Sequence, residues 1–281
     1  MITLLGATGF VGSEIQQTLD SRKIPSYVPA RNDKLIGKEL GDIIYCIGLT
    51  SDFRSRPHDT VTAHVSYLND LIRENEFNSL TYLSSTRVYI HNESTLEDSP
   101  ISIDPKDPFD LFNTSKLTGE LLALNSGRKN IKIARLSNVY GPDFSSDNFL
   151  TSIIRDAIVK KKIEFRTTPD SSKDYISITD VVEILIQLAK LNKTGIYNVA
   201  FGSNLTNEEI SSKIASLTGC SIQTDQDATK IVFPEISISK IIEDIAYKPK
   251  KNLVNELESL IENFKMHFGN ESKTEGKMKK S

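Results

Sequence analysis

The feature that most constrains the fold is a glycine-rich turn close to residue 1. An apolar run, MITLL, is followed by GATGFVG and then by EIQQTLDS, which contains helix-forming residues. A turn without side chains lets the backbone approach a pyrophosphate closely, and the helix N-terminus offers free N–H groups to it. The turn therefore predicts a dinucleotide site at Gly6, Gly9, Phe10, Val11 and Gly12, and a tight turn without a ligand is the alternative.

Strands and helices alternate along the first half of the chain. Short apolar or β-branched runs predict further strands at 24–30, 42–48, 79–85 and 131–137. Helices are predicted at 60–74, where Val61, Val65, Leu68 and Ile72 recur at helical spacing, and at 113–125. Because parallel strands need crossover connections, this alternation predicts an α/β fold with a parallel sheet covered by helices on both faces.

The alternation loosens after residue 140. Helices are predicted at 149–161, 180–190, 207–219 and 252–265, and strands at 173–178 and 195–200. We assign residues 1–140 to a nucleotide-binding domain, with 173–200 returning to its sheet, and residues 141–172 and 201–268 to a smaller C-terminal lobe. The polar segment 269–281 has no apolar periodicity and is predicted to be disordered.

Composition restricts the class of partner. With 34 Lys+Arg against 37 Asp+Glu, the net charge is −3, which predicts neither nucleic acid nor a membrane surface as partner. No run of 18 apolar residues occurs, and no basic segment followed by an apolar stretch opens the sequence, so neither export nor a membrane span is expected. Cys46 and Cys220 cannot form a disulfide framework, so a cytoplasmic location is expected. No metal is expected either, since ligand spacing is missing at His58, His64, His91 and His267.

The end of the second strand usually decides between the two nicotinamide dinucleotides, because it lies beside the adenosine ribose. The sequence there is PARND. Arg31 would accept a 2′-phosphate and slightly favours NADP, whereas Asp33 would bond the ribose hydroxyls and keeps NAD open. Ile47 and Gly48, at the end of the third strand, are also expected to contact the cofactor.

Seven motifs follow one another over residues 1–265: GATGFVG, SSTRVY, FNTSK, RLSNVYGP, KDYISITDVVEIL, GIYNVAFG with NEEI, and IAYKPK. In this order they resemble the extended short-chain dehydrogenase/reductase family of nucleotide-sugar epimerases, dehydratases and ketoreductases. The resemblance implies a Rossmann-type sheet that binds NAD or NADP. It also implies a C-terminal lobe that closes over a nucleoside-diphosphate sugar, and it suggests a homodimer.

The resemblance also assigns roles to single residues. Ser85 matches the catalytic Ser/Thr of the family, and Lys116 matches its lysine, which holds the cofactor ribose and lowers the pKa of a tyrosine four residues earlier. Asn138 matches a substrate contact. Lys173 stands where the family often has a diphosphate-binding arginine.

Two departures from the family pattern bear on the reaction. Phe112 occupies the place of the tyrosine and carries no proton, so the general acid–base is missing there. Thr86 and Arg87 replace the Asp–Glu pair of the dehydratases, which disfavours dehydration. Arg87 is either an exposed residue or a cation that steers a charged substrate group. Tyr89 and Tyr140 are either substitute proton donors or packing residues.

Two hypotheses follow. The first is an NAD(P)-dependent oxidoreductase or epimerase that acts on a nucleotide-linked sugar in polysaccharide precursor synthesis, with keto-sugar reduction favoured and epimerisation open. The second is a catalytically silent protein that binds the dinucleotide or the nucleotide sugar. Phe112 favours the second hypothesis, whereas Ser85 and Lys116 favour the first.

Overall fold

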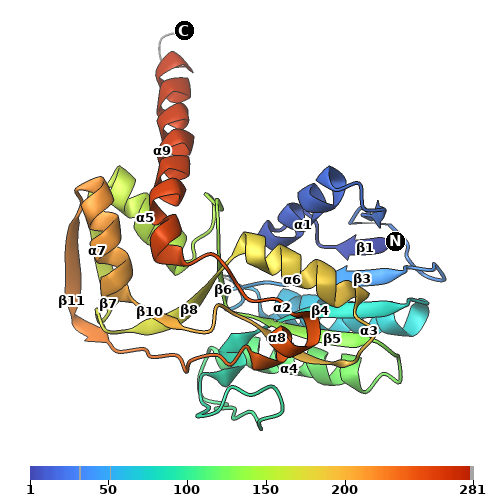
Figure 1. Ribbon diagram of the computed structural model, residues 1–281. Helices are drawn as coiled ribbons and strands as arrows, with labels where there is room; N and C mark the ends of the chain where they lie inside the picture. Colours follow the sequence, from blue (N-terminus) through green and yellow to red (C-terminus); the bar gives the residue numbers. More distant parts are fainter. Residues whose placement is uncertain (32, 51, 279–281) are drawn as a thin grey trace.

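The computed structural model describes residues 1–31, 33–50 and 52–278. Within this part, a six-stranded sheet has the order β2-β1-β3-β4-β5-β9, and all its neighbouring strands are parallel (Figure 1). The strands are β1 (Ile2–Leu5), β2 (Ser26–Tyr27), β3 (Asp42–Tyr45), β4 (Ser79–Ser85), β5 (Ile131–Leu136) and β9 (Gly195–Val199). The predicted α/β class is confirmed.

Helices cover both faces of this sheet, because each turns an apolar stripe toward it. On one face, α1 (Phe10–Ser21) and α6 (Ile178–Lys190) pack their Ile and Leu side chains on β1, β3 and β5. On the other face lie α3 (Tyr67–Glu74) and α4 (Asp110–Leu124). Figure 1 shows α1 and α6 above the sheet and α4 below it. The first domain therefore has three layers, with the sheet between two layers of helices.

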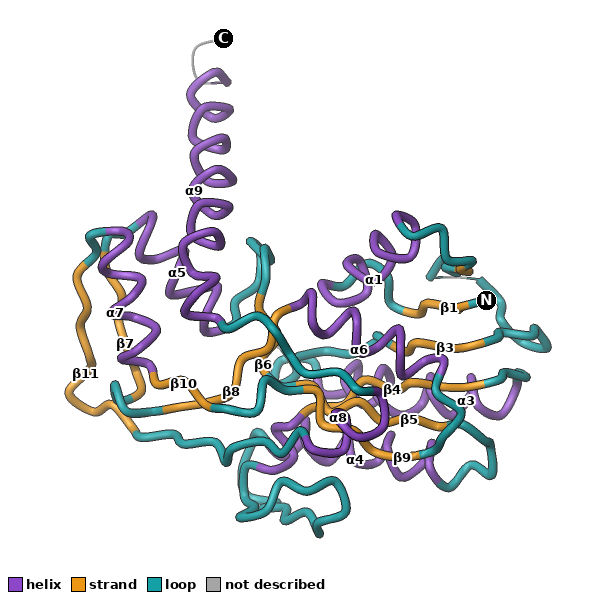
Figure 2. Tube along the Cα trace, viewed as in Figure 1, coloured by secondary structure: helices purple, strands orange, loops and turns teal. Residues whose placement is uncertain are grey.

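A second lobe, formed largely by residues after β5, lies past the carboxyl ends of the sheet strands (Figure 2). It contains a three-stranded sheet in the order β10-β8-β6 and the parallel pair β11-β7. These strands are β6 (Asn138–Tyr140), β7 (Lys162–Thr167), β8 (Ser172–Ser177), β10 (Asn204–Thr206) and β11 (Ser221–Thr229). Its core includes apolar side chains of α5 (Phe149–Val159), α7 (Asn207–Thr218) and α9 (Leu253–Met278).

Four shorter helices complete the part of the chain that is described. They are α2 (Pro57–Val61), the π-helical turn η1 (Thr62–Ser66), the 3₁₀ helix η2 (Thr86–Tyr89) and α8 (Ser239–Ile245). The last of these packs Ile241 into the core of the first domain, although its sequence belongs to the predicted lobe. In the described residues, we find no helix that combines the length and apolarity needed to span a membrane.

The structure differs from the predicted organisation at two strands. The predicted strand 24–30 is reduced to Ser26–Tyr27, because Pro25 and Pro29 cannot donate to a strand ladder. Of the two late strands expected to rejoin the first sheet, only β9 does so. The other, β8, has both edges paired within the second lobe, to β6 and to β10.

The C-terminal segment also differs from the prediction. The helix α9 continues through 269–278, for which the sequence predicts disorder, while 279–281 lie outside the described residues. Once Leu253, Leu257 and Phe264 are packed in the lobe, each further helical residue adds a backbone hydrogen bond without a new nucleation step. The end of the helix extends away from the lobe in Figure 1.

Candidate active site

An open cleft of about 890 Å³ lies at the carboxyl ends of β1, β3, β4 and β5, between the sheet and the second lobe. This edge is where nucleotides bind in doubly wound sheets. The cleft brings together most of the predicted site residues: Gly9, Phe10, Val11, Gly12, Ile47, Gly48, Ser85, Arg87, Phe112, Lys116, Asn138 and Lys173. Of the predicted residues, Gly6 and Arg31 are not in its lining.

The glycine turn has a backbone shape that side chains would block. Gly6 has φ +85°, and a Cβ there would lie 2.8 Å from the carbonyl carbon of Cys46. A Cβ on Gly12 would lie 2.2 Å from the Gly6 carbonyl oxygen, so the helix could not pack on the turn. Gly9 is the N-cap of α1 and provides no side-chain hydrogen bond to the helix. The first N–H groups of α1 thus remain available to an anion, which fits the pyrophosphate of a dinucleotide.

The predicted adenosine-side residue Arg31 is exposed and lies outside the cleft lining. Asp33, the alternative, accepts a hydrogen bond from the Ala30 N–H (3.0 Å) and so shapes the local turn. The choice between NADP and NAD therefore stays a prediction.

Lys116 projects from α4 into the buried floor of the cleft. Its side chain is 4% exposed, and its Nζ donates to the Leu83 carbonyl oxygen at 2.8 Å. Burial lowers the pKa of Lys116 to about 7, although Glu120 acts in the opposite direction. The ammonium retains donors for a further partner, since a lysine has three.

His64 is buried behind the cleft lining and supports it, a role that the sequence analysis missed. Its Nε2 accepts the Leu49 N–H at 3.2 Å, and its Nδ1 lies 2.8 Å from the Ser115 Oγ. Burial, followed by the nearby Lys116 charge, lowers the pKa of His64 to about 3. The neutral imidazole therefore fixes the segment after β3 against α4, close to Lys116.

No sequence signal pointed to His64, because a π-helical turn is responsible for its position. The predicted buried face of 60–74 included Val61, yet Val61 is exposed while Ala63 and His64 are buried. The extra residue in the turn Thr62–Ser66 rotates the helix surface, and such turns occur often at functional sites.

Ser85 ends β4 and caps the 3₁₀ helix that follows. Its Oγ accepts the Arg87 N–H at 3.2 Å. The hydroxyl proton is not used in that bond and remains available to a group in the cleft. Asn138, on β6, donates its amide to the Asp174 carbonyl oxygen on the neighbouring strand β8 at 2.8 Å, so this bond lies within the sheet of the second lobe.

Phe112 lies in the cleft lining and is 5% exposed. Its ring centroid is 5.4 Å from that of Phe53, and its edge meets the His64 ring at 5.5 Å. The aromatic volume is present at this position, but it carries no proton donor.

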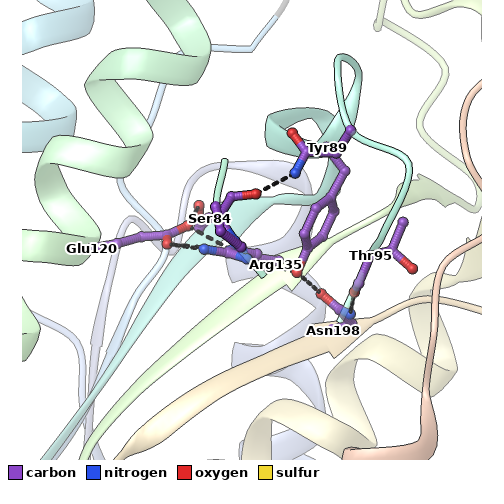
Figure 3. Close-up of polar contacts among 8 residues, drawn as sticks. Ser84, Tyr89, Thr95, Glu120, Arg135 and Asn198 are labelled. Atoms are coloured by element: carbon purple, nitrogen blue, oxygen red, sulfur yellow. Dashed lines mark hydrogen bonds and ion pairs between the residues drawn. The ribbon is translucent and has the colours of Figure 1, made fainter. Parts of the chain in front are cut away.

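Neither tyrosine considered as a substitute donor reaches the cleft. The Tyr89 hydroxyl donates to Asn198 Oδ1 (2.9 Å) and accepts from Arg135 Nη1 (2.6 Å), inside the buried network of Figure 3. The Tyr140 hydroxyl donates to the Lys251 carbonyl oxygen at 3.0 Å. Within the described part of the chain, Tyr175 is the tyrosine of the cleft lining, and its buried hydroxyl has no hydrogen-bond partner.

Beneath the site, a buried charge pair holds the strand that ends at Ser85. Arg135 on β5 donates to both carboxylate oxygens of Glu120 on α4, and Ser84 donates to Glu120 as well. Both charged side chains are 3% exposed. Figure 3 shows the chain of contacts continuing from Arg135 through Tyr89 to Asn198. The network thus joins α4, β4, β5 and β9 under the cleft.

His91 contacts two carboxylates that sequence spacing did not connect with it. The ligand atoms of His91, Asp107 and Asp110 lie within 4.8 Å of one another. The Asp110 carboxylate already accepts from the Asp104 N–H and from Asn113 Nδ2. These contacts, together with the contact to His91, hold the loop before α4 against the start of the helix, which explains the cluster without a metal ion.

We expect the pKa of Lys116 to be visible in the stability of the protein. The folded pKa of about 7 is below the usual 10.5, so the unfolded chain binds an additional proton between these values. The free energy of unfolding should therefore rise as the pH increases through this window. In Lys116→Met the rise should be smaller, as measured by denaturant unfolding at stepped pH. Equal slopes in both proteins would contradict the assigned environment of Lys116.

The strand order and the turn at β1 define the class of protein: a Rossmann-type nucleotide-binding fold with a second lobe over its carboxyl edge. The model of the NAD dependent epimerase/dehydratase family matches residues 2–200, and the chain belongs to this family.

Individual relatives are distant. UDP-glucuronic acid decarboxylase 3 of Arabidopsis thaliana is 24% identical over 177 residues, which cover 59% of this chain and 51% of the relative. UDP-glucuronic acid decarboxylase 6 of the same plant is 22% identical over 178 residues, covering 60% of this chain and 51% of the relative. The matches thus span about half the length of these curated relatives.

Among solved structures, MoeE5 in complex with UDP-glucose and NAD is similar to this chain with a TM-score of 0.81 and 19% identity, covering 95% of this chain and 99% of the other. RMD from Pseudomonas aeruginosa, complexed with NADPH, has a TM-score of 0.75 and 20% identity, covering 94% and 99%. At these identities the likeness shows the fold.

Proposed function

We propose that the protein is an NAD(P)-dependent enzyme that reduces or epimerises a nucleotide-linked sugar, with reduction of a keto sugar favoured. One observation carries the proposal: Ser85 and Lys116 line the same cleft as the uncapped N-terminus of α1. If the glycine turn only connected β1 to α1, the cleft beside it would not need the Ser85 hydroxyl and the Lys116 ammonium. The family and the nucleotide sugars named for its relatives support the same substrate class.

The residues divide the reaction between them. The turn residues 9–12 would hold the pyrophosphate, and Lys116, supported by Leu83 and His64, would hold the nicotinamide ribose. A bound nicotinamide supplies or accepts the hydride. Ser85 would donate its hydroxyl proton in a hydrogen bond to the sugar oxygen at the reacting carbon, and Lys173 would meet the diphosphate as a point charge.

Because Phe112 stands where the family has a tyrosine, the enzyme lacks a general acid–base at this position. In keto-sugar reduction the new alkoxide must gain a proton, and no phenol stands at Phe112 to provide it. We assign that proton to a water molecule that has entered the open cleft. The water gives a proton to the Ser85 Oγ as the Ser85 hydroxyl passes its own proton to the alkoxide, and the hydroxide leaves to solvent. The absence of the Asp–Glu pair at Thr86 and Arg87 leaves no acid and base for loss of water, so dehydration is not proposed.

A catalytically silent binding protein is the second candidate. Phe112 favours it, because a positioned general acid–base typically contributes about 10²- to 10⁴-fold to a rate. The buried Lys116 opposes it, since keeping an amine in that apolar floor without a ligand lowers stability. A homodimer and a preference for NADP stay predictions.

Turnover separates the two candidates. We expect slow changes in absorbance at the reduced-nicotinamide band when the protein is incubated with NAD, NADP or their reduced forms and a panel of keto and hydroxy nucleotide sugars. Ser85→Ala and Lys116→Met should each abolish the change. Saturable cofactor binding without turnover on any sugar would support the silent protein, and a lack of saturable binding at millimolar cofactor would contradict both candidates.

A further inference from the structure

Besides Lys116, three cations line the cleft without a carboxylate ion pair. Arg54, Arg87 and Lys173 all belong to the cleft lining. Within the described ranges, no ion pair at 4.0 Å or less involves any of them, whereas exposed arginines such as Arg22 and Arg56 are paired. Arg87 and Lys173 are half-buried, whereas Arg54 is exposed. Cations that are withdrawn from water usually have a partner, so the two half-buried ones facing one space indicate that an anion is expected there.

Arg87 is the least satisfied of the three. It is half-buried, and its Nε is fully buried without a hydrogen-bond partner. Its guanidinium lies 4.4 Å from the centroid of the Phe109 ring, and the guanidinium of Arg54 lies 3.7 Å from the same centroid. The two guanidinium groups repel each other across this ring, and neither has an ion pair within the described ranges.

The carboxylates closest to Arg87 are already engaged. Asp107 and Asp110 attract the Arg87 charge, but they lie beyond ion-pair distance of it. Their partner is His91, whose Nε2 is 3.6 Å from Asp107 and 3.3 Å from Asp110. Burial remains the largest influence on Arg87 and lowers its pKa from the usual value. Arg87 therefore lines the cleft with only this longer-range attraction to offset its charge.

Arg87 also lies next to the proposed reacting centre. It follows Ser85 by two residues, and its own N–H donates to the Ser85 Oγ. The 3₁₀ helix η2 fixes this relation, because Ser85 caps the helix that carries Arg87. An anion bound by the guanidinium would consequently belong to the same sugar that meets Ser85.

We propose that Arg87, with Arg54 beside it on Phe109, forms a subsite for a carboxylate on the sugar, so that the preferred substrate is a nucleotide-linked sugar acid. The inference rests on the proposed function and specifies its substrate class. A guanidinium pairs with a carboxylate through two parallel hydrogen bonds, which a neutral hydroxymethyl group cannot offer. Lys173, on β8, is left for the diphosphate, which every nucleotide sugar carries.

The test compares UDP-glucuronic acid with UDP-glucose, which differ at one carbon of the sugar. We expect calorimetric titration of the full-length protein, saturated with oxidised cofactor, to give about tenfold or tighter binding of UDP-glucuronic acid. Arg87→Gln should remove this preference by weakening UDP-glucuronic acid alone, and Arg87→Lys should restore part of it. Arg166→Gln, an equal charge change at an exposed residue of β7, should change neither affinity.

Lys173→Met separates this inference from the proposed function. It should weaken both nucleotide sugars by a similar factor, because both carry the diphosphate. If neither sugar binds to the wild-type protein, the proposed function itself fails. If both bind equally, or if Arg87→Gln weakens both equally, the carboxylate subsite is wrong and Arg87 belongs to the diphosphate. Thermal unfolding checks that Arg87→Gln is folded, which we expect since Arg87 has no ion pair to lose.

Discussion

Replacement of Phe112 by tyrosine raises the rate of nicotinamide-linked turnover, by up to about 10²- to 10⁴-fold, the range that a positioned general acid–base contributes. The added hydroxyl enters the cleft four residues before Lys116, whose positive charge favours the phenolate and so lowers the tyrosine pKa. Absorbance at the reduced-nicotinamide band, with the nucleotide sugar that binds most tightly, measures the effect.

Two control variants make the result specific to the proton. Phe112→Leu removes the ring without adding a donor and should not raise the rate. Phe112→Tyr combined with Lys116→Met should lose the gain entirely, because the lysine then neither holds the cofactor ribose nor lowers the phenol pKa from its ordinary value of about 10. An unchanged or lower rate in the single tyrosine variant would show that the proton comes from elsewhere in the cleft and that the pocket is built around phenylalanine.

Replacement of Glu120 by alanine destabilises the fold by about 3–5 kcal/mol, a large part of the roughly 5–15 kcal/mol by which domains are typically stable. The variant leaves the Arg135 guanidinium buried without its carboxylate and deprives Ser84 of its acceptor. The cost comes from an uncompensated charge in a site that is 3% exposed. Urea unfolding at neutral pH measures the loss, and Figure 3 shows the contacts removed.

Glu183→Ala is the matched control. It breaks the Arg22–Glu183 pair, in which both side chains remain accessible to water. Exposed pairs of this kind contribute about 1 kcal/mol or less. Similar losses in the two variants would contradict the assignment of the Glu120 pair as a buried brace. We further expect Glu120→Ala to weaken cofactor binding, since α4 carries both Glu120 and Lys116.

Much of the first domain could be predicted from the sequence because its signals are local. Strand β4 occupies 79–85 as predicted, since its apolar, β-branched run is bounded by polar residues. The turn at Gly6 and Gly12 was visible for the same reason, because the constraint lies within seven consecutive residues. By contrast, β11 is almost entirely polar and exposed, and it forms only because β7 offers it a parallel edge.

The parts of the site that the sequence missed depend on distant contacts. His64 comes from a π-helical turn, and its partners, Leu49 and Ser115, are far from it in the chain. The environment of Arg87 likewise combines Phe109 and Arg54 from two other loops. Neither set of contacts produces a periodic pattern or a fixed spacing along the chain, so neither could be recognised in a single sequence.

The sequence by itself determined the alternation of strands and helices, the glycine turn that leaves the start of α1 open, and the replacement of a tyrosine by Phe112. These follow from covalent geometry and from side chains that are neighbours in the chain. Only the tertiary structure decided that Lys116 is buried with a lowered pKa, that Tyr89 is committed to Arg135, and that Arg87 faces the cleft unpaired. Burial and charge compensation depend on which distant segments pack together, and packing is a property of the whole fold.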